Sequence, residues 1–348
     1  MRDLHVYYNT ILYLSVFCQP IKYYMERFNY AEQRNYVYID WDMSSRCNYA
    51  CAYCEPAAHD GKFDFPTIEN AKLLVDKISK TYTDKFAVFN LFGGEPTIWR
   101  EIPAFFKYVK KSNPNNKVQL LTNGNKTKRW WQKNQNNIDS VVVSVHVAQV
   151  DIVDLVEKFN ACAGSFDIHF QICIDINHFE TAMQQYDYCL KNLDKHIRLD
   201  YKPLRISLDK PESMPYTNFQ INTMKKLKKL PGIKKDHYGS SMVDENNNLV
   251  DLQKLLLEKN NKFKNWACWI GIDTLNITRE GNVTIGSQCF PNFVLGNIHT
   301  LDFEIPYKPV KCQYEYCSCL TDLTTKKIKN PIGIIRIKIS KFEVIIFP

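Results

Sequence analysis

Long apolar runs are absent from this 348-residue sequence. Its apolar N-terminal stretch, residues 7–17, is interrupted by Tyr, Asn and Thr, is too short to span a bilayer and precedes no clear small-residue cleavage site. No internal repeat and no long linker is evident either. These absences argue against a membrane protein, a secreted precursor and a repeat architecture. We therefore expect a soluble, cytoplasmic protein without a membrane partner.

The composition is that of a folded protein. Hydrophobic residues make up 45% of the chain and aromatic residues 13%, enough for a sizeable core. The length accommodates one large domain and a smaller one. Twelve cysteines, partly clustered at metal-ligand spacing, suit a reducing cytosol better than a disulfide scaffold. Three of them lie among apolar neighbours, and we interpret them as packing residues: Cys162, Cys173 and Cys189.

The net charge of +8 permits contact with an acidic partner. The densest basic run, residues 225–229, lies in a stretch whose apolar residues recur at helical spacing: Ile221, Met224, Leu227 and Leu230. This pattern is typical of the solvated face of an amphipathic helix. We therefore do not expect a nucleic-acid partner.

Three cysteines form the most informative motif. Cys47, Cys51 and Cys54 stand in the stretch CNYACAYC, a CxxxCxxC spacing that brings three thiolates onto one short loop. Soft thiolates select iron-sulfur clusters or zinc, and a closed site of either kind normally has four protein ligands. Three sulfurs leave one iron of a four-iron cubane open. Zinc is the alternative, with His59 as the nearby fourth ligand.

A second motif follows about forty residues later in the chain. Residues 88–92 read as a buried strand that runs into Gly93, Gly94, Glu95 and Pro96. The glycines allow the backbone to approach a ligand closely, and the carboxylate can accept a hydrogen bond from a ligand ammonium group. A Gly-Gly-Glu sequence alone is an ordinary turn.

Together the two motifs resemble those of the radical S-adenosylmethionine (SAM) enzymes. The aromatic Tyr53 before the last cysteine and the GGE sequence are both similar to the family's signatures. The resemblance implies a 4Fe-4S cluster on Cys47, Cys51 and Cys54 whose open iron binds SAM. It also implies contacts to the cofactor from Tyr53 and from Gly93, Gly94, Glu95 and Pro96, with Glu95 on the SAM amino group.

The rest of the N-terminal half alternates short apolar runs with helical patterns. Strands are expected at 36–40, 88–92, 118–121, 141–145, 168–174 and 197–200, with helices at 67–81, 102–111, 128–133, 150–160 and 180–193 between them. Strict alternation predicts βαβ units on a parallel sheet. We expect an α/β fold, a partial (βα)6 TIM-like barrel followed by a smaller cysteine-rich α+β domain.

Reaction sites of βα barrels lie at the carboxyl ends of the strands. Two further strand ends there resemble positions at which the family contacts the SAM carboxylate and ribose: Thr122 with Asn123, and Ser144 with His146. Thr122, Asn123 and Gly124 also form a favourable turn sequence, and a strand-end histidine is commonly structural.

The C-terminal part carries a second cysteine group. Residues 274–278 and 282–285 read as a hairpin with Cys268 and Cys289 near its outer ends, and Cys312, Cys317 and Cys319 follow. This is similar to the SPASM and twitch extensions of radical SAM proteins and implies one auxiliary 4Fe-4S cluster held by four of the five. A structural four-cysteine zinc site is the alternative. We expect four regions: an extension (1–35), the barrel (36–207), a bridging, substrate-lining segment (208–265) and the auxiliary-cluster domain (266–348).

The resemblance implies an enzyme that cleaves SAM and abstracts hydrogen from a substrate. We expect it to oxidise, crosslink or epimerise a ribosomal peptide, with flavodoxin or ferredoxin as electron donor. One alternative is oxidation or rearrangement of a small molecule such as a sugar, a nucleoside or a cofactor precursor. The 46 residues before Cys47 are few for a peptide-recognition domain, which favours this alternative. Another is a non-catalytic, zinc-stabilised binding protein.

Overall fold

The computed structural model describes residues 27–204, 206, 214–232, 241–257, 259–287, 294–317, 319–329, 335–339 and 342–346. Cys289 therefore lies outside the described residues, as do residues 1–26 of the expected extension and parts of the expected 208–265 segment.

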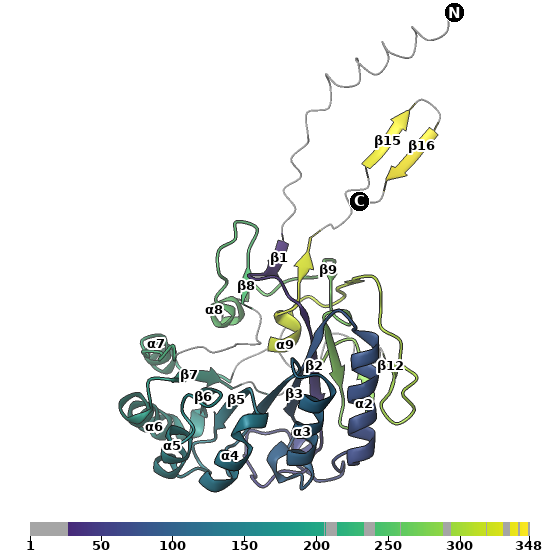
Figure 1. Cartoon of the computed structure of the whole chain (residues 1–348). Helices are drawn as coiled ribbons and strands as arrows, with labels where there is room; N and C mark the ends of the chain where they lie inside the picture. Colours follow the sequence, from purple (N-terminus) through teal and green to yellow (C-terminus); the bar gives the residue numbers. More distant parts are fainter. Residues whose placement is uncertain are drawn as a thin grey trace, which may run out of the picture.

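Six consecutive parallel strands form the centre of the protein (Figure 1). They lie in chain order in the sheet, each hydrogen-bonded to the next: β2 (Tyr36–Asp42), β3 (Phe86–Phe92), β4 (Lys117–Thr122), β5 (Ser140–Val145), β6 (Asp167–Ile174) and β7 (Ile197–Pro203). Because parallel neighbours require a crossover between them, a helix follows each of the first five strands. The predicted mixed α/β fold is confirmed. Closure of these strands into a partial barrel stays a prediction.

The crossover helices lie in an arc along one side of the sheet (Figure 1). They are α2 (Ile68–Thr81), α3 (Ile102–Ser112), α4 (Lys128–Asn134), α5 (Ile152–Asn160) and α6 (Phe179–Asn192). Three begin at side-chain N-caps, namely Thr67, Thr127 and Asp151. Each cap oxygen accepts a backbone N–H of the first turn, which fixes where the helix starts. Short 3-10 turns are η1 (Pro56–Ala58), η2 (Pro96–Ile98), η3 (Gln135–Asn137) and η4 (Ile176–His178).

The two faces of the central sheet differ in chemistry. Apolar side chains such as Trp41 and Phe89 pack on Phe105 of α3, in the large core between sheet and helices. The opposite face is polar at one level across three strands: the Asn90 amide donates to Asp40, and the Gln119 amide donates to Asn90. Alternation along each strand produces this division. The polar face is therefore the one available for ligands.

Elements from the C-terminal part extend the same sheet. Strand β10 (Thr274–Ile277) pairs in parallel with β2, and β11 (Asn282–Thr284) and β12 (Val294–Asn297) follow antiparallel. The sheet order is β12-β11-β10-β2-β3-β4-β5-β6-β7. The predicted hairpin thus exists, and it lies directly beside the strand that leads into the cysteine motif.

A second sheet joins the first described strand to strands from the C-terminal part. Its order is β13-β9-β14-β1-β8, from β13 (Val310–Lys311), β9 (Ala267–Cys268), β14 (Lys327–Ile328), β1 (Arg27–Tyr30) and β8 (Met242–Val243). The remaining elements are α7 (Asn218–Lys225), α8 (Leu252–Leu257), α9 (Leu320–Leu323) and the antiparallel pair β15 (Ile335–Ile339) and β16 (Phe342–Ile346). No described helix is long and apolar enough to cross a membrane.

Helix α7 is shorter than the apolar spacing predicts. It ends at Lys225, whereas the pattern continues to Leu230. Leu230 instead exchanges two backbone hydrogen bonds with Leu199 of β7, at 3.0 and 3.1 Å. Pro231 and Gly232 follow directly and cannot extend a helix well. Pairing with the sheet edge therefore ends the helix early.

Candidate active site

The cysteine loop begins where β2 ends and is held at its base by hydrogen bonds. The backbone N–H of Met43 donates to Phe92 O at the end of β3, at 2.8 Å. The Ser44 hydroxyl donates to Phe63 O at 2.8 Å, and the Ser45 hydroxyl donates to Asp60 at 2.8 Å. These bonds join residues on both sides of the loop, so its two stems are fixed.

Gly93 and Gly94 allow the strand β3 to meet this loop directly. Both have positive φ, 91° and 49°. A Cβ on Gly93 would lie 1.8 Å from Asp42 Oδ1, and one on Gly94 would lie 2.0 Å from Arg46 O. Only glycine fits either position. The N–H of Glu95 then donates to Arg46 O, next to Cys47, at 2.8 Å.

Glu95 is the buried carboxylate of the site, with 1% of its surface exposed. Its Oε1 accepts hydrogen bonds from Thr97 N (3.0 Å), Thr97 Oγ1 (2.6 Å) and Thr122 Oγ1 (2.8 Å). Its Oε2 accepts from Asn123 N at 2.7 Å. Burial raises the carboxyl pKa, and the four donors oppose that shift. Each carboxylate oxygen has two lone pairs, so Oε2, which accepts one hydrogen bond, retains room for a further donor.

Asn123 links this carboxylate to the cysteine loop. Its backbone N–H binds Glu95 Oε2, and its side-chain amide donates to Asn48 Oδ1 at 2.9 Å. Asn48 directly follows Cys47. The predicted residues at the ends of β3 and β4 therefore meet the cysteine motif at the carboxyl edge of the sheet. Pro96 opens η2 and is buried, and Ser144 is buried on β5.

The three motif cysteines are free thiols on one loop. The Cys54 N–H donates to Cys51 O at 3.0 Å, and the Tyr49 N–H donates to Cys47 Sγ at 3.4 Å. Burial raises the pKa of all three thiols, that of Cys51 to about 11. Neighbouring thiolates add to the rise for Cys51 and Cys54, and the Glu95 charge adds to it for Cys47. A bound cation would reverse this trend. Within the described ranges, no three Cys, His, Asp or Glu side chains form a ready-made metal site.

Tyr53 and His146 form a second contact between the loop and the sheet. The Tyr53 hydroxyl and His146 Nδ1 are 2.5 Å apart, and the two rings stack with centroids 5.9 Å apart. Burial, assisted by the charge of Lys202, lowers the pKa of His146 to about 4. Tyr53 also interacts with the thiols of Cys51 and Cys173. Cys173 is buried, as predicted, but it faces the cysteine loop.

Sequence reasoning did not identify Arg279, which joins the C-terminal hairpin to the cysteine loop. Its Nε and one terminal nitrogen donate to Asp42 Oδ2 at 2.9 and 2.6 Å, and the other terminal nitrogen donates to Ala57 O. Asp42 ends β2 and Ala57 follows Cys54. The Arg279 guanidinium also lowers the pKa of the Cys54 thiol, against the larger effect of burial. A lone arginine in a turn gave no local signal of this role.

The C-terminal cysteines divide into two groups. Cys268, Cys312 and Cys317 are buried and influence one another electrostatically, and the Lys327 ammonium lowers the pKa values of Cys268 and Cys312 against the larger effect of burial. Lys327 is itself buried and donates to the carbonyls of Asp322, Leu323 and Thr325 at 2.6, 3.2 and 2.9 Å. Cys319 instead lies near Asp322, Asp40 and Ser287.

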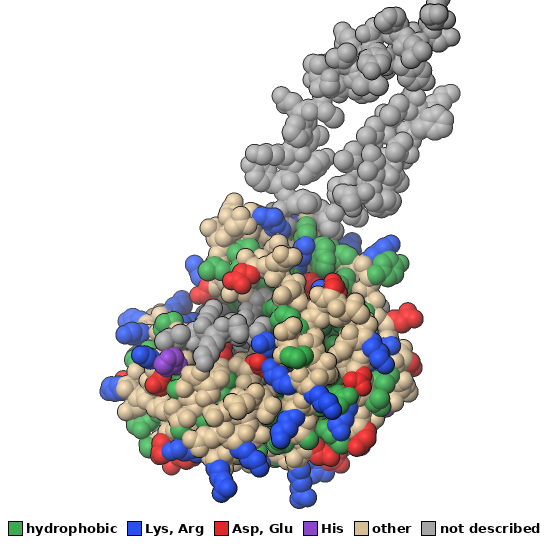
Figure 2. Space-filling model, viewed as in Figure 1, with side chains coloured by type: hydrophobic (Ala, Val, Ile, Leu, Met, Phe, Trp, Pro, Cys, Tyr) green, Lys and Arg blue, Asp and Glu red, His purple; other side chains and the backbone are tan. Residues whose placement is uncertain are grey.

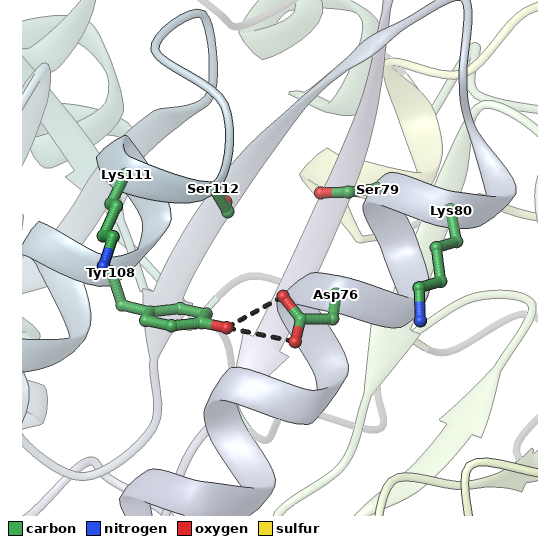
Figure 3. Close-up of a pocket in the computed structure, with 6 residues that line it drawn as sticks. All are labelled: Asp76, Ser79, Lys80, Tyr108, Lys111 and Ser112. Carbon is green, nitrogen blue, oxygen red and sulfur yellow. Dashed lines mark hydrogen bonds between the residues drawn. The ribbon is translucent and has the colours of Figure 1, made fainter.

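Other surface features lie away from this site. Figure 2 shows Lys and Arg side chains scattered among acidic and neutral ones over the visible face, rather than gathered in one patch. A shallow hollow between α2 and α3 lies on the helix side of the sheet, where the Tyr108 hydroxyl meets Asp76 at 2.9 and 3.0 Å (Figure 3). It has no contact with the cysteine loop.

The fold and the site define an α/β protein with a cysteine loop seated on a buried Gly-Gly-Glu strand end. Residues 41–175 match the family model described as the radical SAM superfamily. The matched range includes the cysteine loop, the Gly-Gly-Glu strand end and His146.

Curated relatives match about half of the chain or less. A GTP 3',8-cyclase of Actinobacillus pleuropneumoniae serotype 3 (strain JL03) is 26% identical over 175 residues, 47% of this chain and 49% of the relative. An Fe-coproporphyrin III synthase of Methanosarcina barkeri (strain Fusaro / DSM 804) is 27% identical over 130 residues, 37% of this chain and 31% of the relative. The chain therefore spans about half, or less, of the length of these relatives.

Solved structures are similar at low identity. Native anSMEcpe with bound AdoMet is 15% identical, with a TM-score of 0.49 over 78% of this chain and 80% of that one. Streptococcus suis SuiB bound to precursor peptide SuiA is 12% identical, with a TM-score of 0.43 over 72% and 59%.

Proposed function

We propose that this protein is a radical SAM enzyme. The observation that carries the proposal is the seat of the cysteine loop: Gly94 and Glu95 hold the backbone of Arg46, next to Cys47, while the Glu95 carboxylate lies buried beside it. The match of residues 41–175 to the radical SAM superfamily model supports the same conclusion. Burial of a carboxylate is costly unless donors surround it, and Glu95 Oε2 has room for one donor beyond those that the protein supplies.

Cys47, Cys51 and Cys54 would hold the 4Fe-4S cluster. Their donor chemistry fits iron, and three ligands on one loop leave an iron open for SAM. When bound, the cluster and SAM together supply the electron transfer that yields methionine and a 5'-deoxyadenosyl radical. Arg279 places a cation near Cys54, which favours the thiolate form that iron needs. Asp42 and Ala57 fix that arginine.

SAM would bind across the adjoining strand ends. Glu95 Oε2 has one donor from the protein and would accept the SAM ammonium group as another. Gly93, Gly94 and Pro96 shape the turn, and Thr122 and Asn123 hold the carboxylate. Tyr53 and His146 form an aromatic wall, with a largely neutral imidazole at pH 7 because its pKa is about 4. Ser144 and His146 keep their proposed role near the SAM carboxylate and ribose.

An auxiliary 4Fe-4S cluster would occupy the C-terminal cysteine group. The grouping of Cys268, Cys312 and Cys317 supports these three as ligands. The fourth ligand of the expected twitch-like site would be Cys289 or Cys319. The surroundings of Cys319, with Asp40 and Asp322 close by, favour it less. A structural zinc site is the competing assignment.

Two substrate classes compete. The C-terminal cysteines, which resemble those of SPASM and twitch extensions, and the positive charge favour a ribosomal peptide that is oxidised, crosslinked or epimerised. The relatives named GTP 3',8-cyclase favour a small molecule of the nucleoside or cofactor-precursor type. Either reaction would need an electron donor such as flavodoxin or ferredoxin. We propose a cytoplasmic location because thiolate-bound iron requires a reducing compartment.

Metal analysis after anaerobic purification separates the enzyme from a zinc-stabilised binding protein. We expect a brown protein that holds about four irons on the motif cysteines, plus about four more on the auxiliary group. Ala substitution of Cys47, Cys51 and Cys54 should remove the first set only. Cys189→Ala is the matched control, because this core thiol lies in α6, away from both groups. A colourless protein that holds zinc at both sites would refute the proposal.

A further inference from the structure

The polar face of β6 and β7 carries residues of both charges. Side chains that share this face are paired across the two strands: His169 with Arg198, Gln171 with Asp200, and Cys173 with Lys202. The last pair lies nearest the carboxyl edge, where the cysteine loop meets the sheet. Each of these three levels of the polar face therefore has its own charge pattern.

The charges of the two deeper levels are neutralised within the protein. Arg198 donates to the buried carboxylate of Asp167 at 2.8 Å. The Lys229 ammonium lies 3.2 Å from Asp200. Opposite charges at these distances satisfy one another, so neither level offers a net charge to a ligand.

Lys202 differs from these pairs. It is half-buried, and its ammonium group has no hydrogen bond or ion pair with any other residue in the described ranges. Burial lowers the pKa of His146 and raises that of Cys173, and the Lys202 charge adds to the first shift and opposes the second. Asp175, which directly follows the adjoining strand β6, already accepts from Asn177 N (3.0 Å) and His178 Nδ1 (2.8 Å).

Lys202 lies in a row of residues across the sheet that the cysteine loop contacts. Val145 pairs with Ile172, so His146 lies level with Cys173, and Lys202 is next in that row. Tyr53 reaches the same row through its contacts with His146 and Cys173. Lys202 therefore lies beside the proposed SAM site. It is on β7, one strand further from Glu95 than Cys173, which is on β6.

We propose that Lys202 binds an anionic group of the substrate, a phosphate or a carboxylate, at the carboxyl end of β7. The inference rests on the proposed function, because it places the substrate against the polar face of β6 and β7. A half-buried ammonium without a protein partner gains most from an anionic ligand, since partial burial strengthens the attraction. Arginine supplies the same charge, whereas methionine fills similar space without it.

Direct binding of two probe anions tests this inference without requiring turnover. Sodium tripolyphosphate and citrate are titrated by calorimetry into the full chain, reconstituted anaerobically with iron and sulfide. The variants are Lys202→Met and Lys202→Arg. Lys228→Met is the matched control, because it removes the same charge from an exposed side chain. The dissociation constant of SAM is measured on each protein as well.

We expect Lys202→Met to weaken the preferred anion about ten-fold or more, whereas Lys202→Arg and Lys228→Met stay within about three-fold of the unmodified chain. Preference for tripolyphosphate identifies a phosphorylated substrate, and preference for citrate a carboxylate one. Equal affinity in Lys202→Met, no saturable binding of either anion, or a loss confined to SAM would overturn the proposal. If anion binding depends on Lys202 but the protein binds no iron, the proposed radical SAM function fails instead.

Discussion

Substitution of Arg279 by Met should destabilise the protein in a pH-dependent way. The guanidinium makes two hydrogen bonds to Asp42, and the two side chains are only 17% and 14% exposed. Burial raises the pKa of Asp42 to about 6, and Arg279 is the main group that opposes this rise. Removal of one partner from a buried pair costs about 3–5 kcal/mol.

The sign of the pH effect follows from the pKa. Unfolded Asp titrates near 3.9, so a folded pKa of about 6 means that stability falls as the pH rises from about 4 to about 6. Without Arg279 the folded pKa is higher still, and the fall continues above pH 6. Each further pH unit costs about 1.4 kcal/mol, so the variant should lose about 3 kcal/mol from the buried carboxylate at pH 8, and about 4 kcal/mol in all when the lost contact to Ala57 is added. At pH 5 only about 1 kcal/mol should be lost, from the contact to Ala57.

Urea denaturation of the reduced full chain at pH 5 and pH 8, followed by tryptophan fluorescence, measures this difference. Lys128→Met is the matched control, because its ion pair with Glu157 is exposed and should be worth less than about 1 kcal/mol at either pH. Addition of Asp42→Asn to Arg279→Met should remove most of the pH dependence. A cost that is the same at both pH values would refute the role assigned to the buried carboxylate.

Three further predictions concern the cofactor sites and the C-terminal part. Glu95→Gln keeps the side-chain shape but removes the charge, and should weaken SAM binding about ten-fold or more, measured by equilibrium dialysis; an unchanged dissociation constant would exclude contact with the ammonium group. Ala substitution of Cys268, Cys312 and Cys317 should lower the iron content from about eight to about four per chain, and four irons plus one zinc in the unmodified protein would favour the zinc assignment. Lys327→Met leaves three buried carbonyls without their donor and should cost about 2–4 kcal/mol in the urea midpoint assay, whereas a loss below about 0.5 kcal/mol would show that water replaces the ammonium.

Local sequence signals predicted the central sheet well. The positions of β6 and α2, expected at 168–174 and 67–81, follow from apolar periodicity, which acts within a few residues. Glu95 was found because two glycines before a carboxylate at a strand end restrict the backbone in a recognisable way. The structure places it, as expected from strand order, beside the cysteine loop.

Long-range partners were not predictable in the same way. Arg279 contacts Asp42, 237 residues earlier in the chain, because β10 pairs with β2. Cys173 has the apolar sequence neighbours of a packing residue, and only the sheet register turns it toward Tyr53. The lack of a partner for the Lys202 ammonium among the described residues likewise depends on which acidic residues are already engaged. Such facts arise from tertiary packing, on which a local pattern carries no information.

Production of 5'-deoxyadenosine tests the central claim most directly. The full chain is reconstituted anaerobically, reduced with dithionite and incubated with SAM, beside the Cys47, Cys51 and Cys54 triple Ala variant and the Cys189→Ala control. The account predicts 5'-deoxyadenosine and methionine in equal amounts from the unmodified chain and the control, and neither product from the triple variant. Formation of 5'-deoxyadenosine by the triple variant, or its absence from an iron-loaded unmodified chain that binds SAM, would contradict the account.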